Sequence, residues 1–532
     1  MAFLIAAIGF EFCFDDSYDG LLSKLSIGQF SPFSLFDWHF LGLLWIKEPL
    51  KFIQNLFFDI DVFYTFYIFC TLLAAFYLFY TFGKITTINS TLKLIIYISF
   101  LLIIVDSLIF VTHTRFATLF AGLALFNLAY FSSQSRVKIV VHCLIFLFGF
   151  LVRPESGVGA LLFVIPGLFF HGQPILRLLK VSILPLSCAI LFFVTLESYK
   201  LFTDRLEILI EPDIEYAMST DKFLPLKKNA TKIDSVRYEF ARNGFFIDTS
   251  FVDDKFLRTI ISNTKTIDFK TYIKSVNHVI LFYISYSIVS FALFFILLSH
   301  LFSYQLDLFC KVLAYNIFIF LILTLLDYQV NIADRHFSPL ILLTMLLSAM
   351  FYEKIETFKQ MQFANALFVF LLFFPINYTW RYIRQNNKQV IYNVKNNVVS
   401  LNKFEEKTQG RNVIVTVSGF KLFDKPYSFF KTNRTKNNYF IYDLSTYSIV
   451  PRYTSYLSSK CNCNAAVPLE FFKWLDTTNG IILIDEKRAI ILEKYIKFRY
   501  NKEITFVDLI ELNKLFDKEM WPDLRAKIIV FD

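Results

Sequence analysis

The sequence predicts a polytopic α-helical membrane protein that ends in a soluble α/β domain. Hydrophobic residues make up 56% of the 532 residues, whereas charged residues make up 18%. A soluble domain usually carries about 45–50% apolar and about 25% charged residues, so this chain has too little polar surface to cover its apolar side chains in water. The composition therefore excludes a cytosolic enzyme, a secreted disulfide scaffold and a disordered linker as the overall class.

Apolar runs predict about eleven membrane-spanning helices within residues 1–377. The first run lacks a small-residue cleavage site, so we interpret it as a span rather than a removed signal peptide. The clearest spans cover residues 61–82, 92–111, 181–196, 279–302, 308–326 and 337–352. Weaker candidates cover residues 2–14, 116–131, 139–151, 157–170 and 363–376.

Lys and Arg in the short loops predict the orientation, because cytoplasmic loops retain these residues. With the N-terminus inside, one set of turns carries Lys84, Lys93, Arg136, Lys138, Arg177, Lys180, Lys311, Lys354 and Lys359. The opposite set comprises the loops 15–60 and 198–278, the turns 112–115, 153–156 and 327–336, and the tail after Trp380. We therefore expect an extracytoplasmic active site and an extracytoplasmic C-terminal domain in a bacterial inner or plasma membrane.

The polar turns on the predicted outer side form a candidate phosphate-binding site. Ionisable groups at the end of a span are costly to place near hydrocarbon and suggest function. A snorkelling anchor is the alternative for any single Arg, but three on one side favour a shared site. The candidates are Arg115, Arg153 and Arg335, with the neighbouring His113 and His336. Glu155, in the turn after Arg153, is a candidate for the acceptor side or a second acid.

The first outer loop supplies acidic candidates. Asp15 and Asp16 directly follow the first predicted span, where two carboxylates can act as a general base or hold a divalent cation such as Mg or Mn. A solvated acidic turn is the alternative. Asp37 and His39 lie in the same loop and are candidates for the acceptor side or a second acid, although His39 also fits a hydrogen-bonded interfacial side chain.

The net positive charge and the cysteines do not predict a specific function. The net charge is +9, but Lys and Arg are scattered, so nucleic-acid binding is not expected. Cys461 and Cys463 are separated by one residue, and no second Cys or His pair follows at zinc spacing. A redox-labile or inert pair is therefore favoured over a metal site.

Two segments outside the spans have soluble character. Residues 378–532 are expected to form an extracytoplasmic α/β domain, with strands at 412–417, 439–442, 480–484, 504–507 and 527–531 and helices at 469–476 and 486–498. The outer loop 198–278 is too long for an idle connection, so it should be a lid or a small domain. Apolar positions at 233–246 and 251–261 predict short amphipathic helices lying over the cavity.

The order of these motifs resembles the GT-C superfamily of integral-membrane glycosyltransferases. Asp15-Asp16-Ser17-Tyr18 follows the first span, and Thr112-His113-Thr114-Arg115 begins the fourth. Arg153-Pro154-Glu155-Ser156-Gly157 is similar to the family's Arg-Pro-Glu-Gly turn, and Asp334-Arg335-His336-Phe337-Ser338-Pro339-Leu340 to its Arg-Tyr-x-x-Pro-Leu stretch. The resemblance covers residues 1–376, although His336 stands where the family often has Tyr.

The resemblance implies transfer of a hexose or pentose from a polyprenyl-phosphate donor to a glycan, lipid or protein acceptor. Asp15 would be the base for the acceptor hydroxyl, with Asp16 as its neighbour or a cation ligand. Arg335, Arg153 and Arg115 would stabilise the leaving phosphate, and His113 and His336 could donate hydrogen bonds to it. The alternatives are an envelope glycan polymerase or ligase, a secondary transporter or flippase, and a non-catalytic assembly subunit.

Overall fold

The computed structural model divides the chain into two compact units. The helical unit comprises Met1–Asp15, His39–Glu197 and Ile267–Val390, and the second unit comprises Asp16–Trp38, Ser198–Thr266 and Ile391–Asp532. The structure describes residues 13–14, 44–57, 60–85, 90–131, 135–174, 226, 230–243, 251–260, 269–302, 305–330, 334–351, 370–416, 422, 438–441, 457–465, 467–516 and 523–531, and single residues or short stretches between 178 and 194. Every structural statement below concerns these residues.

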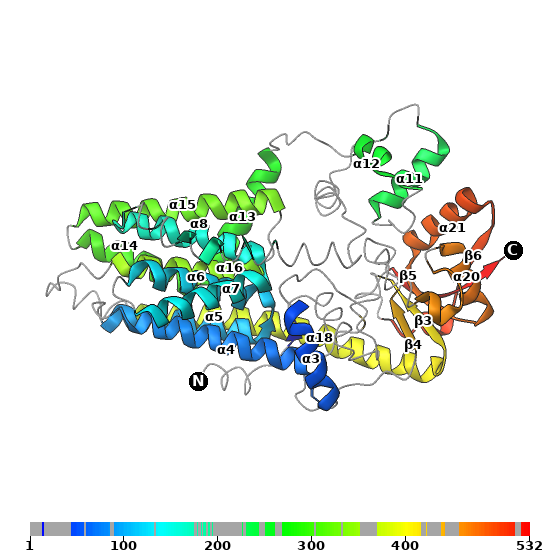
Figure 1. Ribbon diagram of the computed structural model, residues 1–532, viewed down its shortest axis with the longest axis horizontal. Coiled ribbons are helices and arrows are strands. Elements are labelled where there is room, and N and C mark those ends of the chain that lie inside the picture. Colours follow the sequence, from blue (N-terminus) through cyan, green and yellow to red (C-terminus); the bar gives the residue numbers. More distant parts are fainter. Residues whose placement is uncertain are drawn as a thin grey trace. The chain divides into compact units, whose positions relative to one another are not determined.

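The helical unit is a bundle of apolar helices that lie side by side (Figure 1). Its longer elements are α4 (Val62–Gly83), α5 (Ser90–Ile109), α6 (His113–Tyr130), α7 (Arg136–Val152), α8 (Pro154–Phe170), α13 (Phe269–Ser285), α14 (Ser287–Phe302), α15 (Leu306–Val330), α16 (Asp334–Met350) and the first part of α18 (Phe373–Thr408). The short helix α3 (Leu44–Leu56) precedes α4. A two-stranded parallel sheet joins β1 (Cys13–Phe14) to β2 (Phe110–Val111).

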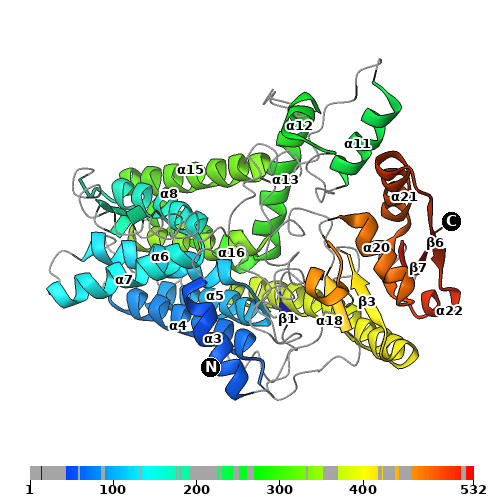
Figure 2. The same cartoon turned by 45° about the vertical axis from the view of Figure 1, so that its right-hand side comes forward.

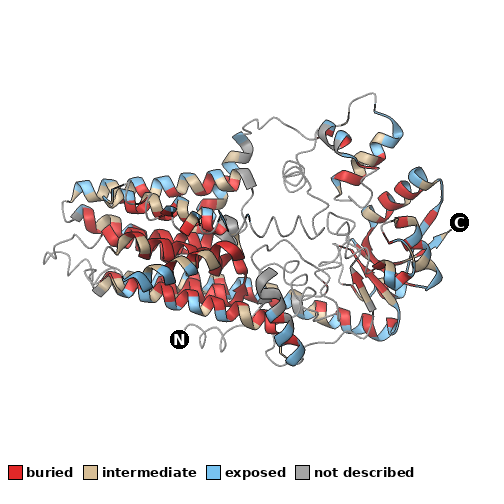
Figure 3. Cartoon of the chain, viewed as in Figure 1, coloured by how far each residue is buried: buried red, intermediate tan, exposed pale blue. Residues whose placement is uncertain are grey.

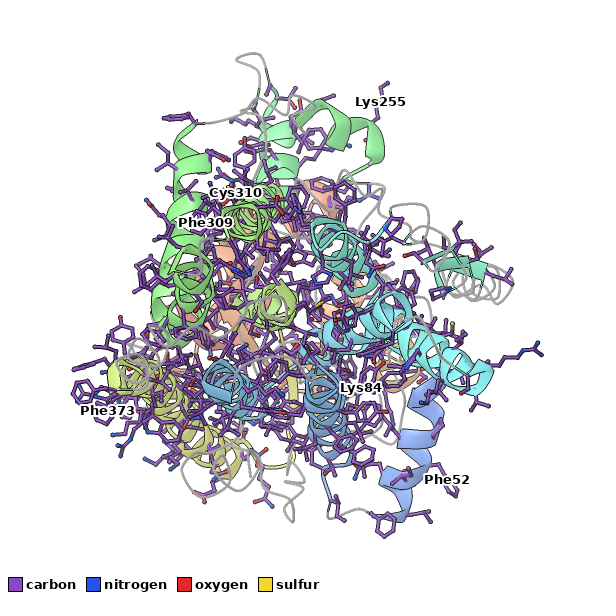
Figure 4. The ribbon with its side chains drawn as sticks, turned by 90° about the vertical axis from the view of Figure 1, so that its left-hand side faces the viewer. Phe52, Lys84, Lys255, Phe309, Cys310 and Phe373 are labelled. Carbon is purple, nitrogen blue, oxygen red and sulfur yellow. A yellow bond between two sulfur atoms is a disulfide. The ribbon has the colours of Figure 1, made fainter. Side chains whose placement is uncertain are left out.

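Helix α16 lies at the centre of the bundle. Every residue from Phe337 to Met350 is buried, and Figure 3 shows the same burial in the neighbouring helices. Figure 4 views the bundle from the end that carries Lys84 and Cys310, with other helices around α16. A helix that is apolar on all sides needs such a position, because each face requires an apolar neighbour.

Glycine allows α6 and α7 to pack closely. A Cβ atom built on Gly149 of α7 would lie 2.6 Å from the carbonyl oxygen of Ala117 and 2.9 Å from the backbone nitrogen of Ala121. Both atoms belong to the backbone of α6, so they cannot move aside as a flexible side chain could. The close approach of these two helices therefore depends on the absence of a side chain at Gly149.

We expect Gly149→Ala to lower the free energy of unfolding by about 1–3 kcal/mol, because the extra methyl group forces α7 away from α6. Gly159→Ala in α8 is the matched control, since its Cβ would meet Leu340 Cδ2 at an ordinary 3.8 Å. Alanine also favours a helix over glycine by about 1 kcal/mol, so the control should be at least as stable as the parent. Thermal unfolding in detergent measures both, and equal losses would contradict the packing argument.

Three described helices are long and apolar enough to cross a membrane: Val62–Gly83, Thr91–Ile109 and Leu306–Tyr328. A fourth candidate is the bent pair Tyr272–Ser285 and Ser287–Leu301. Ser156–Phe170 and Phe337–Met350 are apolar but shorter than the roughly 20 residues that a straight span needs. The described residues therefore support a membrane-compatible helical protein but not the expected count of about eleven spans. Much of the candidate spans 2–14, 181–196 and 363–376 lies outside them.

The helix expected at 279–302 is not straight, because it breaks at Tyr286 and its two parts meet at 88°. Side chains from α18 and α5 hold this break. The Thr379 hydroxyl accepts a hydrogen bond from the backbone N–H of Ile288 (3.2 Å), and the Tyr286 hydroxyl donates to Asp106 (2.8 Å). Neither proline nor glycine occurs at this position, but the Ser290 hydroxyl donates to the carbonyl oxygen of Tyr283 beside the break (2.8 Å), so a local serine and contacts with other helices both hold the bend.

The second unit contains a five-stranded sheet with the order β4-β3-β5-β7-β6. Strands β4, β3 and β5 are parallel, whereas β7 runs antiparallel to both β5 and β6. Figure 2 shows α20 and α21 beside these strands. The elements are β3 (Asn412–Val415), β4 (Asn438–Ile441), α20 (Pro468–Thr477), β5 (Ile481–Asp485), α21 (Glu486–Tyr500), β6 (Ile504–Asp508), α22 (Ile510–Asn513) and β7 (Leu524–Phe531). All five expected strands and both expected helices are present, within a few residues of the predicted bounds.

The long segment 198–278 contributes two helices to this same unit, α11 (Lys232–Arg242) and α12 (Asp254–Ile260). Phe240 stacks on Tyr495 of α21 with ring centroids 4.5 Å apart, and Phe251 meets the same ring at 5.0 Å. Lys494 also pairs with Glu239 (2.9 Å). The amphipathic pattern thus predicted the helices correctly, and they share one hydrophobic core with the tail.

A capping box begins α11. The Thr231 hydroxyl and the Thr231 backbone N–H both donate to the Asp234 carboxylate and lower the pKa of that carboxyl, while the Thr231 oxygen accepts from the Asp234 N–H (3.1 Å). These reciprocal bonds satisfy backbone donors that would otherwise lack a partner at the start of the helix. The local sequence therefore explains where α11 begins.

The tail differs from the sequence prediction at its boundary, and it contains a disulfide. The expected domain boundary between residues 377 and 378 falls inside the continuous helix α18, which belongs to the helical unit as far as Val390. Cys461 and Cys463 form a disulfide, with Asn462 between them at a positive φ of 49°. The cysteine pair is thus a covalent cross-link rather than a metal site.

Candidate functional site

The N-terminal turns of α6, α8 and α16 lie at one end of the helical unit, which we call the polar end. Gly159 and Gly167 of α8 face Leu340 and Leu347 of α16, so these two helices run in parallel. Arg153, directly before α8, contacts Thr114 in the first turn of α6, so the starts of α6 and α8 also lie together. The expected polar turns at 112–115 and 153–156 and the start of α16 are therefore at the same end.

The turn before α6 is set by a strand and a cap. Phe14 of β1 lies opposite Val111 of β2, directly before Thr112. Thr112 is the N-cap of α6, and its hydroxyl oxygen accepts a hydrogen bond from the backbone N–H of Thr114 (3.4 Å). The last two residues of the first expected span, Cys13 and Phe14, therefore form a strand rather than the end of a helix. Asp15 follows Phe14 in the sequence but lies outside the described residues.

Arg153 lies in the sharp connection between α7 and α8. Its backbone is extended (φ −154°, ψ 104°), as expected of a residue before proline, and Pro154 then begins α8. The Arg153 Nη1 donates to Thr114 Oγ1 (2.7 Å) and lies 3.0 Å from His113 Nε2. A guanidinium can only donate, so His113 Nε2 accepts this bond and the ring proton lies on Nδ1. His113 and Thr114 are buried, whereas Arg153 is partly exposed.

Asp106 and Arg115 form a buried ion pair beside the break in α13–α14. Arg115 Nη1 lies 2.8 Å from Asp106 Oδ2, and the two side chains are 4% and 1% exposed. The Tyr286 hydroxyl donates to the same carboxylate oxygen (2.8 Å), and its ring contacts Tyr382. The carboxylate thus compensates the Arg115 charge, and a donor phosphate would have to compete with Asp106 for this guanidinium.

A second acid pairs with histidine on α13 and α15. His278 Nδ1 lies 2.9 Å from Asp327 Oδ1. Asp327 is 4% exposed, whereas His278 is 35% exposed. The His278 ring packs against Phe337 in the first turns of α16, with centroids 5.4 Å apart at 81°. This contact places the histidine at the polar end.

Two buried hydroxyls lie in the same region. Ser156 is in the first turn of α8 and Ser338 is near the start of α16, and they are 5% and 1% exposed. Within the part of the chain that the structure describes, neither Oγ has a hydrogen-bond partner. Buried hydroxyls are normally satisfied, so these two indicate a place where water or a polar ligand binds.

The structure brings together two of the predicted site residues, His113 and Arg153, and pairs Arg115 of the same turn with Asp106. Arg335 and His336 lie in the first turn of α16, and Glu155 lies in the first turn of α8, but their side chains are outside the description. Asp15, Asp16, Asp37 and His39 are all outside the described residues. Their expected roles stay predictions.

Sequence reasoning missed four residues of this region: Asp106, His278, Tyr286 and Asp327. An acid in an apolar segment is itself a signal, and Asp106 is such an acid. Its partner is nine residues away across a helix end, so no helical spacing connects them. His278 and Asp327 are 49 residues apart, and nothing local indicates that they meet.

The described part of the polar end offers anion recognition and proton transfer rather than metal binding. Among those residues, no group of three or more His, Cys, Asp or Glu side chains could hold a metal ion. The expected Mg or Mn ligands, Asp15 and Asp16, are not among them. The arrangement instead combines a partly exposed guanidinium, helix N-termini and an Asp–His pair, which can bind a phosphate and accept a proton.

Comparisons with known proteins found no relative of this chain. No protein-family model matches the chain, and neither a curated protein nor a solved structure matches it.

Proposed function

We propose that the protein is an integral-membrane glycosyltransferase of GT-C type, which moves a sugar from a polyprenyl-phosphate donor to a glycan, lipid or protein acceptor. The observation that carries the proposal is the partly exposed Arg153 at the N-terminus of α8, held by Thr114 and His113. A guanidinium recognises phosphate oxygens through paired N–H groups, and a helix N-terminus favours an anion. The buried hydroxyls of Ser156 and Ser338 supply further polar groups at the same end.

In this proposal the donor phosphate lies by Arg153, and Arg335 and His336 approach it from the first turn of α16. Fixed donors stabilise the negative charge that develops on the phosphate as its bond to the sugar breaks. Arg115 has a positioning role instead, because Asp106 already binds it inside the bundle. Asp15 is the proton acceptor that the sequence predicts, with Asp16 as its neighbour or a cation ligand.

The finer topology is also part of the proposal: about eleven spans, with the polar end and the second unit on the extracytoplasmic side of a bacterial inner or plasma membrane. The Cys461–Cys463 disulfide supports this side, because disulfides persist in oxidising compartments and are rare in the cytosol. A lipid-linked donor suits that location, since nucleotide sugars are cytoplasmic.

Turnover of lipid-linked donors tests the function. The purified protein in detergent is mixed with undecaprenyl phosphate carrying radiolabelled glucose, galactose or arabinose and with a membrane extract as the acceptor source. We expect one donor to release undecaprenyl phosphate and to label an acceptor without any ion gradient. Failure to turn over any of the three donors, under conditions where the protein stays folded, would contradict the proposal.

A secondary transporter or flippase is the second candidate, favoured by the broken helix at Tyr286. Transporters bind substrates at discontinuous helices, and here the break contacts the buried Asp106–Arg115 pair. Such a protein would move its substrate across vesicles and leave it chemically intact. The same labelled lipids, reconstituted in proteoliposomes with and without a gradient, distinguish transport from transfer.

A further inference from the structure

We propose that helix α3 (Leu44–Leu56) lies flat in the membrane surface, with its exposed apolar side among the lipid headgroups and upper acyl chains of the leaflet at the polar end. In this position α3 sets the depth at which the polar end lies in the bilayer. The inference rests on the membrane placement that is part of the proposed function, but it does not depend on the transfer of sugar.

Helix α3 is too short to cross a membrane and runs in another direction than the candidate spans. Its 13 residues extend about 20 Å, whereas the hydrocarbon core of a bilayer is about 30 Å thick. Figure 4 looks along α4 and α5, which appear end-on, whereas α3, which carries the labelled Phe52, is seen from its side. Figure 1 shows the same change of direction between α3 and α4. A helix that runs across the spans lies in the plane of the membrane.

The exposed side of α3 is apolar. Phe52 and Leu56 are one turn apart and are 64% and 59% exposed. Ile53 and Phe57 are also one turn apart and are 38% and 53% exposed, and the N–H of Phe57 donates to the carbonyl oxygen of Ile53 (2.9 Å), which continues the helical turn. Residues i and i+4 share a helix face, so the four side chains form one surface. Short helices with such a surface bind at the boundary between headgroups and acyl chains.

Gln54 fixes the orientation of α3 relative to α4. Its side chain is buried, and its Nε2 donates to the carbonyl oxygens of Phe57 (3.2 Å) and Ile60 (2.9 Å). Its Oε1 accepts from the backbone N–H of Val62 (3.2 Å), the first residue of α4. These bonds satisfy backbone groups in the short connection between the two helices. Helix α3 therefore keeps one orientation and presents the same apolar side outwards.

Helix α3 lies at the polar end, because it directly precedes the start of α4. Tyr67, in the second turn of α4, contacts the ring of His113 in the first turn of α6, with centroids 6.1 Å apart. Farther along both helices, the Tyr77 hydroxyl donates to the carbonyl oxygen of Leu123 (3.5 Å). Helices α4 and α6 therefore run in parallel, and α4 begins at the same end as α6.

The neighbouring helix indicates that lipid covers this surface. Helix α4 is long and apolar enough to cross a membrane, and Phe69, Leu73, Phe76 and Tyr80 are between 43% and 70% exposed. Their spacing places them on one face of α4, which requires acyl chains as its cover. The bilayer around that face ends near the start of α4, and the apolar side of α3 lies at this level. One bilayer thus covers the exposed apolar sides of two consecutive helices.

Photo-crosslinking in proteoliposomes tests this placement. The full-length variants Phe52→p-benzoylphenylalanine, Asn55→p-benzoylphenylalanine and Phe69→p-benzoylphenylalanine are illuminated in vesicles of phosphatidylethanolamine and phosphatidylglycerol, and mass spectrometry measures the yield of lipid adducts. We expect similar yields at Phe52 and at Phe69 of α4. Asn55 is exposed on the same helix, about 130° from the centre of the apolar side, and is the matched control. It should give at least about threefold fewer adducts, because an interfacial helix turns its polar side to water. If the Phe52 variant does not fold, Leu56 takes the label.

The outcomes separate the inference from the proposed function. Lipid adducts at Phe69 but not at Phe52, or adducts of Phe52 with protein, mean that another segment or a second copy of the chain covers α3, and they overturn the inference alone. Equal yields at Phe52 and Asn55 also overturn it, because α3 would then be immersed in lipid. A folded Phe69 variant without lipid adducts overturns the membrane placement and the inference with it. Absence of sugar transfer beside the expected adducts overturns the proposed function and leaves the inference intact.

Discussion

Replacing Arg153 with Gln is expected to reduce sugar transfer by about 10²–10³-fold, which is the usual cost of removing one donor that stabilises developing negative charge. The guanidinium is held by Thr114 and His113 and is partly exposed, so it can approach a phosphate without rearranging. Gln keeps a polar side chain of similar reach but has no charge. Arg153→Lys should retain part of the activity, since an ammonium is a point charge without the paired donors.

The measurement is the rate of undecaprenyl phosphate release from the labelled donor, with binding of undecaprenyl phosphate alone as a second readout. Arg136→Gln is the matched control, because Arg136 begins the same helix α7 that ends before Arg153 and is exposed at the other end. We expect the control to retain parental rates and affinity. Equal rates and equal lipid-phosphate binding for Arg153→Gln and the parent would remove Arg153 from the site.

Asp106→Ala should destabilise the helical unit by about 3–5 kcal/mol, because it leaves the Arg115 charge buried without its carboxylate. The two side chains are 1% and 4% exposed, so water cannot easily replace the lost partner. The Tyr286 hydroxyl loses its acceptor as well, and the bend between α13 and α14 loses one of its restraints. Thermal unfolding in detergent, or reversible unfolding in mixed micelles, measures the loss.

Two controls make this result specific. Asp307→Ala breaks an exposed pair with Lys311 and should cost at most about 1 kcal/mol. The double variant Asp106→Leu/Arg115→Met removes both charges and should recover much of the stability, since a buried ion pair can often be replaced by apolar side chains. A double variant as unstable as Asp106→Ala would mean that the loss came from packing rather than from an uncompensated charge.

Short-range patterns predicted most of the secondary structure. The runs predicted as strands at 480–484 and 504–507 correspond to β5 and β6, and α11 was visible from its apolar spacing. Likewise, Pro154 marks the end of α7, because a residue before proline avoids helical geometry. In each case the determining interactions lie within a few residues of each other.

Contacts between distant residues account for what could not be predicted. The break at Tyr286 depends on Asp106 and Thr379, which lie on other helices. The association of α11 with the tail depends on Tyr495, more than two hundred residues away in the chain. For the site, the predicted side chains of His113 and Arg153 proved to be in contact, but the pairing of Asp106 with Arg115 and of His278 with Asp327 carried no local signal.

The shared core of α11, α12 and the tail has a consequence for biosynthesis. The ribosome completes Phe240 and Phe251 before it makes helices α13 to α18 of the bundle, and it adds their aromatic partner Tyr495 more than two hundred residues later. The second unit can therefore reach its native core only after α21 has been made. A stop codon after α18 would leave both phenylalanine rings in water. The truncated chain would then expose an apolar surface to chaperones and proteases, and it would not form a self-contained membrane module.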